Sequence, residues 1–184
     1  MHWLKTSFLS LLAYTTISSC SLSNIYSTSS AQVSMTLALS ITTSAGSNKQ
    51  AESSIDMDKQ MVKFSLKIRD FKFDNSFVEN AFEESYMEAG SYPEAVFQGK
   101  LKNPINLKSK SAQKIDIVGD LMMHGVKKTK TITAHITVIS ATQIKVVSDF
   151  VVKASDHKID ISASMFANGR DEIKSTLNAI YQKK

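Results

Sequence analysis

Few residues of the types that carry out chemistry stand at the spacings that a catalytic or metal site requires. His124, His135 and His157 fall on separate predicted strands or turns, without the i, i+4 pairing of a zinc helix and without cysteine partners. The carboxylates between residues 83 and 88 fit the solvated face of a short helix better than an acid/base pair. The chain also lacks a G-x-S-x-G motif and a glycine-rich phosphate cradle. We therefore predict a protein that is not an enzyme and needs no metal or nucleotide cofactor.

Length and composition indicate one domain with a large apolar core. The chain has 184 residues, 42% of them hydrophobic, with nine phenylalanines and eight methionines. Its formal charge is +5, but the basic residues are scattered rather than gathered beside stacking aromatics, which argues against nucleic acid as a partner. The tightest basic group, Lys127, Lys128 and Lys130, fits a solvated turn, with a docking patch for anionic headgroups as the alternative.

The amino-terminal segment has the features of an export signal. Lys5 precedes a short apolar stretch from Phe8 to Ile17, which is too short to span a bilayer, and Ile17-Ser18-Ser19-Cys20 has the residue types of a bacterial lipobox. We predict a signal peptide over residues 1–20, lipidation at Cys20 and a location on the periplasmic side of the cell envelope. Cleavage after Ala31, giving a secreted protein without an anchor, is the alternative. Because Cys20 is the only cysteine, no internal disulfide can form.

The remaining chain is predicted to be a flexible tether followed by strands. The serine-rich residues 21–32 show no periodic apolar face and predict the tether, which leaves residues 33–184 as the domain. Alternating apolar and polar residues predict strands with one buried face. These strands span residues 33–41, 62–68, 94–102, 114–123, 129–138, 143–152, 156–163 and 171–181.

One segment departs from this alternation. Val78, Phe82 and Tyr86 recur every fourth residue between Asn75 and Gly90, which predicts a short helix with a capping box at Ser76 and Glu79. The phase slips at residues 69–70, where we expect a bulge. Gly99 and Gly119 lie inside alternating runs and predict bulges or close backbone approaches, whereas Gly46 and Gly125 lie at breaks in the pattern and predict turns.

Eight or nine strands with little helix fit either a sandwich or a closed barrel, and the periodicity leaves both open. The order of motifs from Phe71 to Lys130 distinguishes them. F-K-F at 71–73 is followed by E-E-S-Y-M-E at 83–88, Y-P-E-A-V-F-Q-G at 92–99 and D-L-M-M-H-G-V-K-K-T-K at 120–130. This series resembles the YceI-like family over residues 33–181. The motif positions are Phe71, Phe73, Phe82, Tyr86, Tyr92, Pro93, Phe97, Gly99, Leu121, His124, Gly125, Val126 and Lys128.

The resemblance implies an all-β fold, an extended antiparallel lipocalin-like barrel of about eight strands with one short helix against its opening. It also implies a ligand inside the barrel, an isoprenoid quinone, a polyprenyl chain or a fatty chain. Met122 and Met123 adjoin in a strand, so one of them must face inward, where a flexible thioether suits a pocket for a mobile chain. We expect the cavity lining to include Phe71, Phe73, Phe82, Tyr86, Phe97, Leu121, Met123, His124 and Phe150.

One departure from the family pattern bears on the ligand headgroup. Asn80-Ala81-Phe82-Glu83 stands where the family typically has a histidine before the phenylalanine and an asparagine after it, so no polar headgroup contact is predicted there. The first hypothesis is thus a lipid-binding protein that sequesters or carries its ligand. The second is an envelope stress or structural protein with a solid barrel that acts through surface contacts. The sequence leaves the oligomeric state open, with a homodimer as one option.

Overall fold

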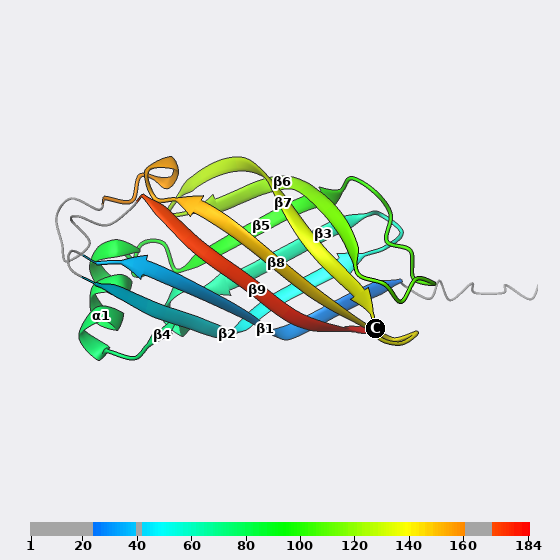
Figure 1. The fold of residues 1–184 in the computed structure, drawn as a ribbon. Coiled ribbons are helices and arrows are strands. Elements are labelled where there is room, and N and C mark those ends of the chain that lie inside the picture. Colours follow the sequence, from blue (N-terminus) through cyan, green and yellow to red (C-terminus); the bar gives the residue numbers. More distant parts are fainter. Residues whose placement is uncertain (1–23, 40–41, 161–170) are drawn as a thin grey trace, which may run out of the picture.

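The computed structural model describes residues 24–39, 42–160 and 171–184 and shows a closed antiparallel β-barrel (Figure 1). Around the barrel the strands follow the order β1, β9, β8, β7, β6, β5, β3, β2, and β1 pairs with β2 to close the sheet. This arrangement confirms the predicted fold class. The strands are β1 (Ile25–Ala38), β2 (Thr43–Asp56), β3 (Met61–Lys67), β4 (Lys72–Phe73), β5 (Glu94–Leu101), β6 (Gln113–Met123), β7 (Val126–Val138), β8 (Gln143–Lys153) and β9 (Glu172–Lys183).

In the described part of the chain, helical structure is limited to short segments at one end of the barrel. The helix α1 (Ser76–Ala81) runs into a π-helical turn (Phe82–Tyr86), and 3₁₀ turns occupy Ile68–Asp70 and Ser155–His157. In Figure 1, α1 lies beside β4 at the end opposite the carboxyl terminus. None of the helical segments in the described part of the chain has the length and apolar character needed to cross a bilayer.

The start of α1 differs in detail from the predicted capping box. The Asn75 side chain caps the helix by accepting hydrogen bonds from the backbone N–H groups of Phe77 and Val78, at 2.8 and 3.4 Å. Glu79 reaches back further, accepting a hydrogen bond from the Phe73 backbone N–H at 3.0 Å and one from Lys72 Nζ at 2.7 Å. The Lys72 ammonium and this N–H lower the pKa of Glu79. Glu79 thereby fastens β4 to the helix.

The tether prediction is wrong from Ile25 onward, because β1 begins there. Tyr26 and Ala31 are buried, and the Tyr26 hydroxyl donates a hydrogen bond to the Ala141 carbonyl at 2.9 Å. Register shifts against β2 between Thr28 and Val33 interrupt the alternation of inward and outward residues. The interrupted period and the serine content explain why this part of the strand resembled a flexible segment.

Two further differences concern β2 and the segment after β8. Strand β2 was not predicted, because four of its five buried positions, Gly46, Asn48, Ala51 and Ser53, are small or polar and only Ile55 is large and apolar. Gly46 is not in a turn but lies within β2 opposite Phe73. The predicted strand at 156–163 is wrong for residues 156–160, which form the end of a 3₁₀ turn and the residues after it; the rest of that prediction falls outside the described residues. The bulge expected at residues 69–70 is instead the 3₁₀ turn.

The backbones of β5 and β6 approach closely where two glycines face each other. Gly99 pairs with Gly119 without a register shift, so the predicted close approach is present and the alternative of a bulge is not. A Cβ atom on Gly119 would lie 2.3 Å from the Gln98 carbonyl oxygen and 2.4 Å from the Gly99 Cα atom. These neighbours are backbone atoms, so a side chain at position 119 requires the strands to separate.

We expect Gly119→Ala to lower the free energy of unfolding by about 1–3 kcal/mol, the usual cost of overpacking. Gly90→Ala is the matched control, because a Cβ atom at Gly90 meets nothing within 4 Å. Urea denaturation followed by circular dichroism measures both changes. Equal stability of the two variants would contradict the close approach of β5 and β6.

Candidate functional site

The interior of the barrel contains an apolar cavity of about 80 Å³. Alternation along each strand creates it, since every second side chain points inward; β5 shows this most clearly, with Ala95, Phe97, Gly99 and Leu101 all buried. Side chains from seven strands form the lining. They are Ser53, Ile55, Val62, Phe64, Phe97, Ile117, Leu121, Ile132, Ala134, Ile136, Val146, Ser148, Phe150, Leu177 and Tyr181.

The polar groups of this lining all have hydrogen-bond partners. The Tyr181 hydroxyl donates to Ser53 Oγ at 2.8 Å, and Ser53 Oγ donates to the Lys63 carbonyl at 2.8 Å. Ser148 Oγ donates to the Thr133 carbonyl at 2.7 Å. Burial raises the pKa of Tyr181 to about 12, so this group stays neutral at physiological pH. The lining offers no charge, metal ligand or activated nucleophile, and its chemistry suits hydrocarbon.

Three of the nine residues predicted to line the cavity do so. Phe97 and Leu121 are cross-strand neighbours on β5 and β6, and Phe150 enters from β8. The prediction missed the rest of the lining, most notably Phe64, which pairs directly with Phe97 across β3 and β5. The alternation of Val62, Phe64 and Leu66 was visible in the sequence, but only the register of β3 against β5 places Phe64 beside Phe97.

Four other predicted residues form an aromatic cluster at the end of the barrel beside α1. Phe82 lies at its centre, with ring centroids 5.5 Å from Phe71, 5.1 Å from Phe73 and 5.8 Å from Tyr86. The Phe73 ring also covers Gly46 of β2, where a Cβ atom would lie 2.5 Å from the ring. Burial, with a smaller contribution from the Asp171 charge, raises the pKa of Tyr86 to about 12. None of the four belongs to the cavity lining; they fill the barrel end beneath the helix.

The last two predicted residues, Met123 and His124, belong to a tight hairpin between β6 and β7. His124 and Gly125 have φ angles of 49° and 70°, the left-handed conformation that both central residues of a type I′ turn require. The expected turn at Gly125 is therefore confirmed. Lys127, Lys128 and Lys130, which were predicted to lie in a turn, instead belong to β7, which begins at Val126. The Tyr92 ring packs against His124, with centroids 4.2 Å apart.

His157 links this hairpin to the 3₁₀ turn after β8. Its Nδ1–H donates to the carbonyls of Met123 and Val126, at 3.2 and 3.0 Å, and the Nδ1–H of His124 donates to the His157 carbonyl at 3.2 Å. Burial lowers the pKa of His157, against the opposing effect of its two carbonyl partners. His124 and His157 thus hold backbone segments together, and among the described residues no three metal-ligating side chains cluster.

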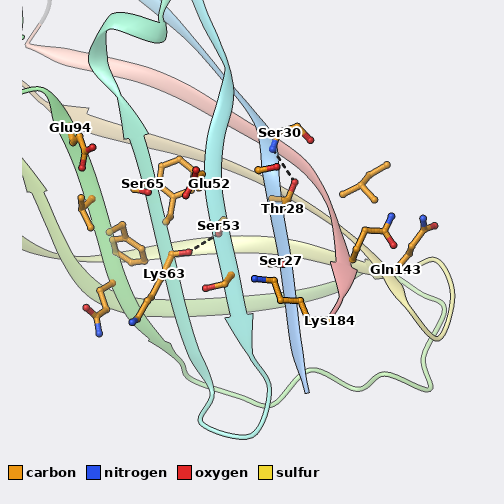
Figure 2. A pocket seen from close by; sticks show the side chains of 18 residues that line it. Ser27, Thr28, Ser30, Glu52, Ser53, Lys63, Ser65, Glu94, Gln143 and Lys184 are labelled. Carbon is orange, nitrogen blue, oxygen red and sulfur yellow. Dashed lines mark hydrogen bonds between the residues drawn. The ribbon is translucent and has the colours of Figure 1, made fainter. Parts of the chain in front are cut away.

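A second, larger hollow of about 1090 Å³ lies on the outer face of the barrel (Figure 2). Glu52, Lys63, Ser65 and Glu94 line it from β2, β3 and β5, while serines and Thr28 of β1 form another wall. Its lining combines hydroxyl and charged groups with the apolar side chains of Phe64, Val96, Phe97 and Ile180, so it is more polar than the interior cavity. Volume alone would favour the groove as a ligand site, but its charged and hydroxyl groups suit an apolar chain less well than the interior lining does.

A family model, the YceI-like domain, matches residues 24–179, which include β1 from its start and the whole barrel as far as Ala179 of β9. The chain belongs to the YceI-like family. No curated protein matches it.

Solved structures share the fold of this YceI-like domain at low sequence identity. A polyisoprenoid-binding domain from Saccharophagus degradans, implicated in plant cell wall breakdown, is 12% identical with a TM-score of 0.74, covering 88% of this chain and 99% of that one. BcnA from Burkholderia cenocepacia is 14% identical with a TM-score of 0.65, covering 82% and 95%. The YceI protein of Campylobacter jejuni is 20% identical with a TM-score of 0.62, covering 76% and 84%. At these identities the likeness concerns the fold.

The lowered pKa of His157 predicts how the stability of the protein depends on pH. In the unfolded chain, His157 takes up a proton near pH 6.5, the ordinary pKa of histidine. In the folded protein the same side chain takes up its proton only at a lower pH. The unfolded state therefore binds more protons in this window, so stability should fall as the pH drops below about 6.5. Asp156 favours the charged form of His157 and Lys130 opposes it.

We expect His157→Asn to flatten the dependence of the melting temperature on pH between about pH 7 and pH 5. The Asn amide can still donate to a carbonyl but does not titrate. His135→Asn is the control, since His135 is exposed on β7 and its replacement should leave the pH profile unchanged. An unaltered slope in His157→Asn would show that His157 does not carry the effect.

Proposed function

We propose that this protein is an exported lipid-binding protein that holds a long isoprenoid or similar amphiphile in the barrel and sequesters or carries it. The enclosed apolar cavity is the observation that carries the proposal, since its polar groups are all engaged with the protein itself. Membership of the YceI-like family and the fold shared with a polyisoprenoid-binding domain support it. In this role the protein makes and breaks no covalent bond.

The energetics of apolar transfer suit such a ligand. Burying one methylene is worth about 0.8 kcal/mol, so ten buried carbons would contribute roughly 8 kcal/mol before the costs of ordering the chain. Ligand pockets usually measure about 300–1,000 Å³, whereas this cavity measures about 80 Å³. The side chains around it must therefore move apart to admit a long chain. Phe64 and Phe150 are only partly buried, which makes them the aromatic side chains of the lining that can move most readily.

The small volume also favours a second candidate function. If the interior side chains keep their places, the barrel is a solid scaffold that acts through its outer surface, as an envelope stress or structural protein would. The outer groove and the lysines at the start of β7 are then the surfaces for a partner. The presence or absence of a bound chain separates the two functions.

Native mass spectrometry of protein purified gently from bacterial envelopes should detect a bound isoprenoid or fatty chain. Ala134→Leu fills the cavity from β7 and should remove most of that ligand, whereas His135→Leu, the outward neighbour on the same strand, should retain it. Circular dichroism checks that both variants fold. If Ala134→Leu does not fold, Phe97→Ala replaces it, and the enlarged cavity should increase the occupancy or the length of the bound chain.

A wild-type protein without any bound chain would support the solid-barrel function. So would a bound chain whose amount and length are the same in the wild type and in every folded cavity variant. In that case the lipid lies elsewhere on the protein.

We also propose export with acylation at Cys20, supported by the Ile17-Ser18-Ser19-Cys20 sequence and the preceding apolar stretch. Radiolabelled palmitate should enter the wild-type protein in a bacterial host and should not enter Cys20→Ser. Amino-terminal sequencing is the control, because a lipoprotein begins at Cys20. An unlabelled protein that begins at Gln32 would instead show secretion without an anchor.

A further inference from the structure

The two ends of the barrel carry opposite net charge. We call the end formed by residues 24–27, 56–61, 100–114, 138–143 and 182–184 the basic end; in Figure 1 it is the end marked C. These segments contain eight lysines against two carboxylates, Asp56 and Asp58. All eight lysines are exposed: Lys59, Lys100, Lys102, Lys108, Lys110, Lys114, Lys183 and Lys184.

Backbone hydrogen bonds join the segments of the basic end into one surface. The Leu101 N–H donates to the Gln60 carbonyl at 2.9 Å, which ties the end of β5 to the turn between β2 and β3. The Lys184 N–H donates to the Ile25 carbonyl at 2.9 Å, which ties the last residue to the start of β1. Lys110 Nζ donates to the Ile139 carbonyl at 3.4 Å, so the loop before β6 meets the turn after β7.

Little of this positive charge is neutralised within the protein. Among the described residues, only Lys59 of the eight lysines pairs with a carboxylate, Asp56, at 3.3 Å. Lys110 Nζ contacts only a main-chain carbonyl, and the other lysines are exposed, so the fields of these ammonium groups add at a nearby surface.

The opposite end of the barrel is acidic. Its described segments, residues 67–94, 123–128, 153–160 and 171–172, contain eleven carboxylates against seven lysine and arginine side chains. Lys127 and Lys128 belong to this end, where carboxylates outnumber them. The barrel therefore has a charge dipole along its axis, and a negatively charged surface will attract one end and repel the other.

We propose that the basic end docks onto an anionic lipid bilayer. Each lysine near such a surface adds to the attraction, and the lysines here are spread over an end face rather than along a groove. Ile139 lies in the same surface, is 45% exposed and can enter the headgroup region. Nucleic acid fits less well, because stacking platforms are missing: the aromatic side chain of these segments, Tyr26, is buried.

The position of the chain start agrees with this orientation. Asn24, the first described residue, lies at the basic end, where its carbonyl accepts a hydrogen bond from the Met57 N–H at 3.0 Å. Cys20 precedes it by four residues, which span at most about 14 Å when extended. The orientation of the anchored protein rests on the acylation proposed above, whereas the affinity of the basic end for lipid does not. The acyl anchor and the basic end together hold α1 away from the bilayer.

Vesicle sedimentation tests the docking surface with the Cys20→Ser chain, which carries no acyl group. Vesicles of phosphatidylcholine with added phosphatidylglycerol should bind this protein at least about tenfold more tightly than vesicles of phosphatidylcholine alone, and high salt should abolish the difference. Lys102→Glu/Lys108→Glu/Lys110→Glu should remove the preference. The matched control Lys128→Glu/Lys153→Glu/Lys158→Glu makes the same change in net charge at the acidic end and should retain it.

A label reports the orientation directly. Cys20→Ser leaves the chain without cysteine, so an environment-sensitive dye can be placed at Ile139→Cys or Val151→Cys, at two positions of similar exposure, 45% and 43%. Only the dye at position 139 should report a less polar environment when the protein binds anionic vesicles. Equal responses at both positions, equal losses in the two triple variants, or binding to single-stranded DNA without binding to vesicles would overturn the proposal. Failed acylation of Cys20 with intact vesicle binding would overturn the anchor alone.

Discussion

Pairing between β1 and β2 closes the sheet into a barrel, and the other features of this protein depend on that closure. β1 also pairs with β9, so each of the eight long strands has a neighbour on both sides. Closure gives the sheet an inside, and the two-residue period of a strand then sends alternate side chains into it. The register shifts of β1 between Thr28 and Val33 lie in the same seam, where one strand must satisfy two partners.

An interior lined in this way is apolar, so each buried polar group within it needs a protein partner. Tyr181, Ser53 and Ser148 meet this requirement through each other and through main-chain carbonyls. The hydroxyl groups of the lining are thus already paired within the protein. The cavity therefore selects an apolar ligand by its fit and by the area that it buries. The larger outer groove has a mixed lining, in which charges and hydroxyls lie beside apolar side chains. Chemistry rather than volume distinguishes the interior as the candidate lipid site.

The two ends of the barrel are built by different interactions. At the acidic end, the Phe82 cluster fills the opening, Glu79 joins β4 to α1, and His157 holds the β6–β7 hairpin through its backbone carbonyls. At the basic end, backbone hydrogen bonds join turns whose side chains are mostly polar, and the lysines remain exposed. One end is thus organised by packing, and the other presents charge to its surroundings.

The sequence alone determined the fold class, the short helix after β4 and the hairpin at Gly125, and it left a bulge or a close backbone approach as the alternatives at Gly99 and Gly119. These features follow from local signals, namely alternation, a fourfold repeat and glycines at defined positions, together with the motif order from Phe71 to Lys130. Alternation could not reveal β2 or the first half of β1, because register shifts interrupt β1 and most inward residues of β2 are small or polar. Local pattern also could not separate the phenylalanines that line the cavity from those that fill the barrel end. Phe97 and Phe82 are equally apolar and both buried. Only the registers of β3, β5 and β6 and the packing of α1 place Phe97 in the cavity wall and Phe82 beneath the helix. The tertiary structure decided this because strand register and packing join residues far apart in the chain.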